Sequence, residues 1–206
     1  MSQILLITSS PRGEASYSTK VARALADKLA YGSPNHKLVV RNLAHAPLPH
    51  IDETFAFARN AVPADRTPAQ KAALIKSDEL VAELLASDIL VIGSAMINFG
   101  VSSNLKSYLD YIVRPGATFR YTDKGPEGLA KGKKTYIVTA RGGVYSQGPM
   151  QAVNFQDTYL KGVLGFIGMT DIEVIPVEGV AFGPEAAEKA LSGALTKVAA
   201  VQSLAA

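Results

Sequence analysis

Residues 4–18 read ILLITSSPRGEASYS, an apolar run that passes through a serine-rich turn into a helical pattern beginning near Thr19. A strand that leads directly into a helix is the first half of a strand–helix–strand unit, and such units build parallel sheets. Proteins of this class often hold an anion where the first helix begins. This stretch therefore decides the fold class and indicates where a ligand is to be sought.

Five short runs rich in Ile, Val and Leu recur along the chain, at residues 4–8, 38–42, 89–92, 135–139 and 172–177. They lack the alternation of apolar and polar residues that a half-solvated strand shows, which predicts strands covered on both faces. Helical patterns separate the runs, so we expect right-handed crossovers and a parallel sheet between two layers of helices.

Five strands favour the flavodoxin-like order 2-1-3-4-5 over a six-stranded dinucleotide-binding fold. We therefore expect one domain over residues 1–206, an α/β three-layer sandwich with a five-stranded parallel sheet. In this order, ligands bind beyond the carboxyl ends of the strands, where the first and third strands separate. The loops that leave the first, third and fourth strands there are residues 9–18, 94–100 and 140–148.

The composition excludes several classes of protein. The chain has no cysteine, so it can form no disulfide, thiol redox centre or cysteine zinc site, and any redox chemistry needs a cofactor. Its net charge of +3 comes from scattered residues rather than from the basic stripe that nucleic acid requires. Neither a membrane-spanning run nor a signal peptide is evident. We predict a cytoplasmic protein that binds no nucleic acid, membrane or metal.

The serine-rich turn offers hydroxyl groups where the first helix begins. Ser16 or Ser18 stands at the position of a helix N-cap, and the free amides and the dipole of that helix favour an anion. Hydroxyls such as that of Ser10 can hold a terminal phosphate without the glycines that a dinucleotide pyrophosphate needs. A plain capped turn explains the serines equally well when this segment is considered alone.

Apolar side chains fill the loop after the third strand. Met96, Ile97 and Phe99 are costly to expose at the edge of a sheet, so a flat apolar group such as an aromatic ring system is expected to cover them. Ordinary packing under the following helix is the alternative.

Two glycines mark the loop after the fourth strand, between Arg141 and Tyr145. Gly142 and Gly143 allow backbone amides to lie against a ligand, where they would stabilise the negative charge that a reduced flavin ring acquires. A tight turn is the alternative. The segment 114–129 is too long and too aromatic for a simple connection, which predicts a functional loop or a partner surface.

Together these motifs resemble the FMN-dependent NADH azoreductases, also described as NADH:quinone oxidoreductases, of the flavodoxin-like superfamily. The resemblance covers essentially the whole chain and rests on the Ser-x-Ser ending of the first turn, Met96-x-Asn98-Phe99, the run 116–129, Arg141-Gly142-Gly143 and residues 164–168. It implies tightly bound FMN, NADH or NADPH as co-substrate, and quinones or azo compounds as acceptors in a two-step exchange through the flavin N5.

The resemblance also implies which residues form the site. The cofactor-binding set would be Ser10, Ser16, Tyr17 and Ser18 at the phosphate, Met96, Ile97, Asn98 and Phe99 along the ring, and Ala140, Arg141, Gly142 and Gly143 at its pyrimidine edge. A homodimer would share a substrate pocket containing Tyr121, Tyr145 and Val163. No catalytic acid or base and no metal ligand is expected, because the flavin carries the chemistry.

Ala95, Ile97, Ala140, Tyr145 and Val163 depart from the residues common in the family, which bears on potential and substrate range more than on FMN binding. A flavodoxin-like electron carrier without a small-molecule substrate is the alternative function. Such carriers tend to be strongly acidic, whereas this chain is slightly basic. A cofactor-free α/β interaction domain is a third possibility, which flavin absorbance in the purified protein would eliminate.

Overall fold

One parallel sheet organises the protein in a computed structural model that describes residues 2–31 and 36–202. Its strands are β1 (Ser2–Thr8), β2 (His36–Asn42), β3 (Ile89–Ala95), β6 (Lys134–Ala140) and β7 (Asp171–Val177). They lie in the order β2-β1-β3-β6-β7 with every neighbouring pair parallel. Because β4 and β5 belong to a separate hairpin, this arrangement is the predicted 2-1-3-4-5 order.

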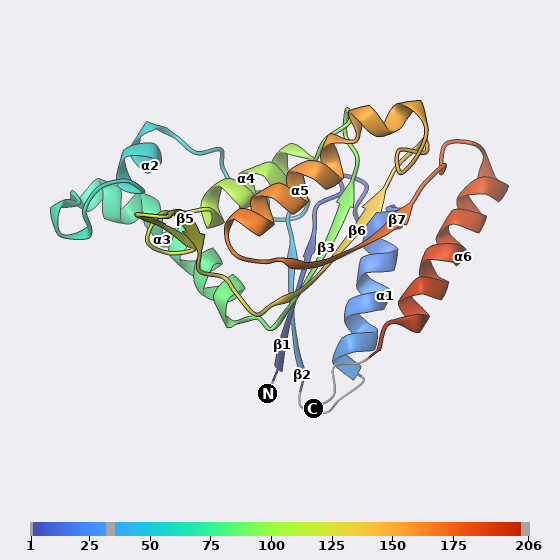
Figure 1. Cartoon of the computed structure of the whole chain (residues 1–206), viewed down its shortest axis with the longest axis horizontal. Coiled ribbons are helices and arrows are strands. Elements are labelled where there is room, and N and C mark those ends of the chain that lie inside the picture. Colours follow the sequence, from blue (N-terminus) through green and yellow to red (C-terminus); the bar gives the residue numbers. More distant parts are fainter. Residues whose placement is uncertain (1, 32–35, 203–206) are drawn as a thin grey trace.

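Helices cover both faces of the sheet, which confirms the three-layer prediction (Figure 1). Successive residues of a strand point to opposite faces. Leu5 and Ile7 therefore pack with α3 (Pro68–Ala86), α4 (Ser103–Ile112) and α5 (Phe155–Phe166), together with the short α2 (Glu53–Ala58). Ile4 and Leu6 pack on the other side with α1 (Tyr17–Tyr31) and α6 (Pro184–Ala200).

The two outer strands differ from the sequence-based expectation of strands covered on both faces. Residues of β2 and β7 are in large part half-buried or exposed, and Val40 of β2 is 43% exposed. Both strands lie at the edges of the sheet, where the flanking helices cover them incompletely. The inner strands β1, β3 and β6 are almost wholly buried, as expected.

Local sequence determines where several helices begin. Thr67 caps α3, because its Oγ1 accepts from the Gln70 amide at 3.2 Å while Gln70 Oε1 accepts from the Thr67 amide at 3.0 Å. Pro68 follows at the first helical position, where its missing N–H is no loss. At α5, Asn154 Oδ1 accepts from the Asp157 amide at 3.3 Å. This last cap fixes the start of a helix that faces the carboxyl edge of the sheet.

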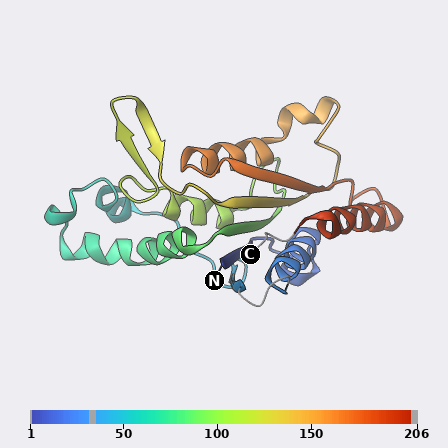
Figure 2. The ribbon, with the colours of Figure 1, turned by 60° about the horizontal axis from the view of Figure 1, so that its bottom comes forward.

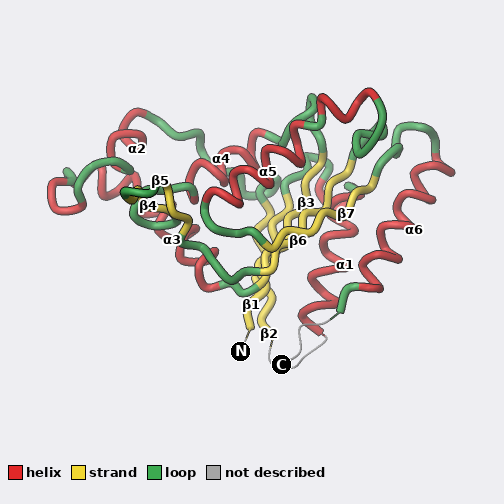
Figure 3. The backbone as a smooth tube through the Cα atoms, viewed as in Figure 1, coloured by secondary structure: helices red, strands yellow, loops and turns green. Residues whose placement is uncertain are grey.

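The segment 114–129 contains a two-stranded antiparallel hairpin, β4 (Phe119–Thr122) and β5 (Gly125–Gly128), which stands away from the main sheet (Figure 2). Figure 3 shows that loops alone connect it to α4 and β6. Its base is fixed at Gly128, where a Cβ atom would lie 2.2 Å from the backbone nitrogen of Gly168 and 2.3 Å from the carbonyl carbon of Ile167. Only glycine allows the two backbones to approach so closely.

Among the described helices, none is long and apolar enough to cross a membrane.

Replacing Gly128 with alanine is expected to destabilise the fold by about 2–3 kcal/mol, because backbone atoms rather than flexible side chains block the added methyl group. Urea unfolding followed by circular dichroism measures the change. Gly162→Ala on the exposed side of α5 is the matched control, since nothing lies within 4 Å of a Cβ there, and it is expected to be neutral or stabilising by about 0.5–1 kcal/mol. Equal effects of the two substitutions would contradict the proposed close approach.

Candidate functional site

A cleft of about 340 Å³ lies at the carboxyl ends of β1, β3 and β6, where the sheet order predicts a ligand. Its volume falls within the range of about 300–1,000 Å³ typical of ligand pockets. The last residues of β3 and β6, the start of α1 and the loops that follow β1, β3, β6 and β7 supply its lining: Ser10, Pro11, Arg12, Ser16, Tyr17, Ala95, Met96, Ile97, Ala140, Arg141, Gly142, Val180 and Ala181. The three loops singled out in the sequence therefore meet at one site.

Hydroxyls and backbone amides make up one end of the cleft. Ser16 precedes α1, and its carbonyl accepts from the Lys20 amide at 3.0 Å, so Ser16 occupies the N-cap position. The hydroxyls of Ser16 and Ser18 are 3.1 Å apart and, like Ser10, both residues are buried. The amides of the first turn have no acceptor within residues 2–31 or 36–202. This end of the cleft is suited to an anion.

A strained two-residue turn makes the apolar side of the cleft. Ile97 and Gly100 exchange two backbone hydrogen bonds of 3.0 Å, and between them Asn98 and Phe99 have φ angles of 45° and 71°. Left-handed backbone is rare for a residue such as Phe99 and costs about 1–2 kcal/mol. The turn leaves Ile97 and Phe99 39% and 43% exposed, so these side chains do not pack under the following helix. Met96 is half-buried at the cleft wall.

The glycine loop is held by the chain that follows β7. The carbonyls of Arg141, Gly142 and Gly143 accept from the amides of residues 179–181 at 3.0–3.2 Å. A Cβ on Gly142 would lie 3.3 Å from the Cβ of Ala181, so close packing of the two loops favours a small residue there. Within the part of the chain that the structure describes, the amides of Gly142 and Gly143 have no acceptor. They remain available to a ligand.

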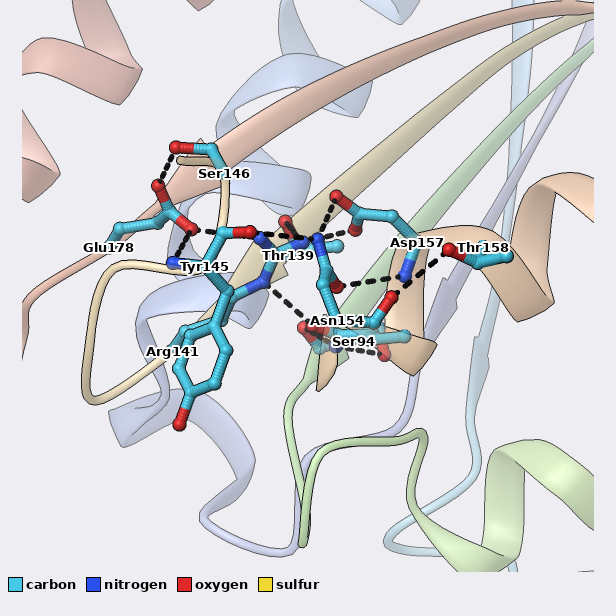
Figure 4. A network of polar contacts seen from close by, with 10 residues as sticks. Ser94, Thr139, Arg141, Tyr145, Ser146, Asn154, Asp157, Thr158 and Glu178 are labelled. Atoms are coloured by element: carbon cyan, nitrogen blue, oxygen red, sulfur yellow. Dashed lines mark hydrogen bonds and ion pairs between the residues drawn. The ribbon is translucent and has the colours of Figure 1, made fainter. Parts of the chain in front are cut away.

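The Arg141 side chain extends toward the start of α5 and the end of β7, although the residue lines the cleft (Figure 4). Its guanidinium is fully buried and binds four side chains. Nε donates to Gln156 at 3.1 Å, Nη1 to Glu178 at 2.8 Å, and Nη2 to Thr139 at 3.0 Å and to Asp157. The guanidinium therefore supports the loop from behind and is not free to bind a ligand.

Further hydrogen bonds extend this network to the neighbouring strand and loop (Figure 4). Gln156 Nε2 donates to the carbonyl and hydroxyl of Ser94 at 3.1 and 2.9 Å, and Glu178 accepts from the Tyr145 amide at 2.8 Å and from Ser146. The network thus joins the ends of β3, β6 and β7 to the start of α5. Sequence reasoning missed Gln156, Asp157 and Glu178, because nothing local marks them as partners of Arg141.

The Glu178 carboxyl is held in its charged form by these contacts. Burial by itself raises its pKa, but hydrogen bonds from Ser146, the Tyr145 amide and Arg141 together place that pKa below the ordinary value of 4.5. The stabilising contribution is therefore present above pH 4.5 and is lost as the pH falls through the lowered pKa.

Comparison with known proteins identifies the family. A family model described as the flavodoxin-like fold matches residues 2–201. The chain is 54% identical to FMN-dependent NADH:quinone oxidoreductase 1 of Rhizobium etli, and the match covers 96% of this chain and 97% of that protein. It is 56% identical to an FMN-dependent NADH:quinone oxidoreductase of Agrobacterium fabrum, with the same coverage. The chain belongs to the FMN-dependent NADH:quinone oxidoreductase family.

Solved structures of azoreductases share the architecture of this oxidoreductase. A crystal structure of an azoreductase from Bacillus anthracis matches with a TM-score of 0.89 and 30% identity, covering 97% of each chain. An FMN-dependent NADH-azoreductase from the same species, solved in complex with FMN, matches with a TM-score of 0.85 and 25% identity over 97% of this chain and 98% of that one.

The remaining residues predicted for the site of this oxidoreductase differ in their surroundings, and they do not line the cleft. Tyr145 lies beside the apolar turn, with its ring centroid 6.3 Å from that of Phe99. Val163 is half-buried in α5 and packs against the core. Tyr121 is 74% exposed on β4, where its ring meets the edge of Phe119. Ser18, Asn98, Phe99 and Gly143 adjoin the cleft without lining it. No group of acidic or histidine side chains among the described residues could hold a metal ion.

The Glu178→Gln variant tests the network. We expect it to be less stable than the unmodified protein at pH 7, and the difference to shrink as the pH falls below 4.5, because only the unmodified protein then loses a charged partner of Arg141. Urea unfolding at a series of pH values measures this. Parallel stability profiles of the two proteins would show that Glu178 does not act as described.

Proposed function

We propose that this oxidoreductase binds FMN in the cleft and uses it to pass electrons from NADH or NADPH to quinones and aromatic azo compounds. One observation carries the proposal: the cleft joins free helix amides and buried serines at one end to an apolar turn and unpaired glycine amides at the other. FMN has the same polarity, with a phosphate at one end and a flat ring at the other. The names of relatives at 54–56% identity support this assignment.

The residues present fit the phosphate end of that cofactor. The orphan amides at the start of α1 and the Ser16 and Ser18 hydroxyls supply neutral donors, and the exposed Arg12 adds a positive charge at the rim. The turn holds a single glycine, Gly13, and so lacks the close backbone approach that a pyrophosphate needs. A terminal monophosphate suits it better.

The other end of the cleft suits the flavin ring, whose charge changes when the ring is reduced. When bound, FMN supplies the acceptor and donor of two electrons. Met96 and Ile97 would shield the ring from water, while the amides of Gly142 and Gly143 would stabilise negative charge at its edge. No side chain needs to act as an acid or base. We propose that nicotinamide and acceptor occupy the exposed side of the site in turn, which is a ping-pong mechanism.

We further propose a cytoplasmic homodimer whose subunits complete each other's substrate pocket. Tyr121 on the projecting hairpin and Phe155 at the start of α5 are 74% and 56% exposed, so both aromatic side chains are available to a partner subunit. Tyr145 and Val163 would line the pocket from the cofactor side. Sedimentation of the purified protein measures its mass, and a monomer would contradict this part of the proposal.

Anaerobic stopped-flow measurements test the activity. The purified protein is expected to carry FMN, NADH alone should bleach the flavin absorbance, and a quinone or azo dye added afterwards should restore it. Double-reciprocal plots of steady-state rates that are parallel at several acceptor concentrations would support the two-step order. The same series with NADPH decides the nicotinamide preference. A colourless protein that takes up no FMN would disprove the proposal, whereas bleaching that requires both substrates would disprove only the two-step order.

Replacing both Ser16 and Ser18 with alanine is expected to weaken FMN binding about tenfold or more while weakening riboflavin much less. The two hydroxyls are charge-assisted donors to a phosphate that riboflavin lacks. Quenching of flavin fluorescence measures both affinities. Ser192→Ala on the exposed side of α6 should change neither. An equal loss for the two ligands would place the phosphate elsewhere.

The Phe99→Gly variant separates backbone strain from ligand contact. Without flavin, we expect a net gain of about 0.5–1 kcal/mol in the free energy of unfolding, since Asn-Gly suits the two-residue turn and removes the left-handed strain. FMN affinity is expected to fall, because the apolar side of the site is lost. Asn98→Gly is the control, because asparagine tolerates left-handed backbone and its replacement releases little strain. Marked destabilisation of the flavin-free Phe99→Gly protein would contradict the claim that the left-handed backbone at Phe99 is strained.

A further inference from the structure

A second cavity of about 340 Å³ lies beside the ends of α2 and α4. Helix α2 itself lies across the molecule from α6 (Figure 1). It is lined by Arg59, Arg66 and Arg114, together with residues 60–63 and 115–116. None of these residues lines the cleft described above. The cavity is therefore a separate feature of the molecule, which the proposed function does not use.

Arg59 and Arg66 are each anchored through one part of the guanidinium. Nη2 of Arg59 donates to the carbonyl of Val113 at 3.0 Å, and Nε of Arg66 donates to the carbonyl of Ala58 at 3.0 Å. These bonds hold the two side chains at the ends of α4 and α2. Nη1 of Arg59 and both terminal nitrogens of Arg66 have no acceptor elsewhere in the described structure.

Arg114 is the most enclosed of the three and is 7% exposed. Its Nη1 donates to Ser77 Oγ at 2.9 Å and to Asp78 at 2.6 Å. Its Nε, like that of Arg59, is buried and has no partner among residues 2–31 and 36–202. A buried donor without an acceptor has lost water and gained nothing in return, which is unfavourable. The Arg114 guanidinium is thus held in place with part of its hydrogen-bonding capacity unused.

The lining carries positive charge that this chain leaves largely unbalanced. It holds three arginines and no carboxylate, and the one carboxylate that the described chain pairs with them is Asp78, whose side chain is 63% exposed. Guanidinium groups remain charged at any physiological pH and repel each other at short range. We propose that this cavity binds the phosphate or carboxylate group of an organic anion.

The rest of the lining indicates an organic anion in preference to a bare inorganic one. Ala61, Val62, Pro63 and Pro115 place apolar surface beside the charged groups. A phosphate or carboxylate fits the planar fork of an arginine, and the attached organic group would cover the apolar surface. A bare ion would leave most of the volume to water.

Calorimetric titration of the FMN-saturated protein tests the proposal, because FMN then occupies the cleft and the arginine variants distinguish binding in the cavity from binding over the flavin. The probes are phenyl phosphate, benzoate and the neutral benzyl alcohol. We expect at least one anion to bind and benzyl alcohol not to bind; the tighter anion identifies phosphate or carboxylate as the preferred group. Arg59→Gln and Arg66→Gln should each weaken binding about tenfold, since each removes charge-assisted hydrogen bonds. High salt should weaken it as well.

Arg23→Gln is the matched control, since Arg23 lies on α1 outside the cavity and pairs with Glu14 at 3.6 Å. It should leave the affinity unchanged. The proposal is overturned if neither anion binds more tightly than benzyl alcohol, or if Arg23→Gln weakens binding as much as the cavity variants do. Circular dichroism verifies folding, and should Arg59→Gln fail to fold, the half-buried Arg66 decides. A protein that retains no FMN would count against the proposed function alone.

Discussion

The burial of Arg141 constrains the carboxyl edge of the sheet more than any other interaction. A guanidinium removed from water must be matched by carboxylates and other acceptors, and removing one partner of such a group typically costs about 3–5 kcal/mol. Here the partners come from the start of α5 and from the end of β7. Because the arginine fork has fixed geometry, these segments can take only one arrangement around it.

That arrangement explains how the cleft keeps its shape without filling its own interior. The glycine loop is supported from behind by the Arg141 side chain and from one side by residues 179–181, and its amides are left without an acceptor among the described residues. The Asn98–Phe99 turn stores strain on the opposite wall. The amides without acceptors and the backbone strain both raise the free energy of the chain. The hydrogen-bond network around Arg141 offsets this cost.

Much of the fold could be predicted from the sequence because its signals are local. Apolar runs and helical patterns gave the sheet order and the three loops, and the Ser16 cap follows from the residues beside it. The hairpin escaped notice because β5 is only four residues long and contains Pro126, which is unusual within a strand. The orientation of Arg141 depends on partners 16 and 37 residues away, which no local pattern reveals.

The hairpin of β4 and β5 shares no ladder with the main sheet and is anchored at its base, where Gly128 meets residues 167–168 and the Phe119 ring lies 4.6 Å from that of Phe166. Lengthening or reshaping its tip around residues 123–124 therefore alters its reach without shifting the register of any of the five parallel strands. The exposed tip of the hairpin is thus less closely tied to folding than its buried base. Such a division allows the hairpin tip to diverge while the parallel sheet and the cleft at its carboxyl edge are kept.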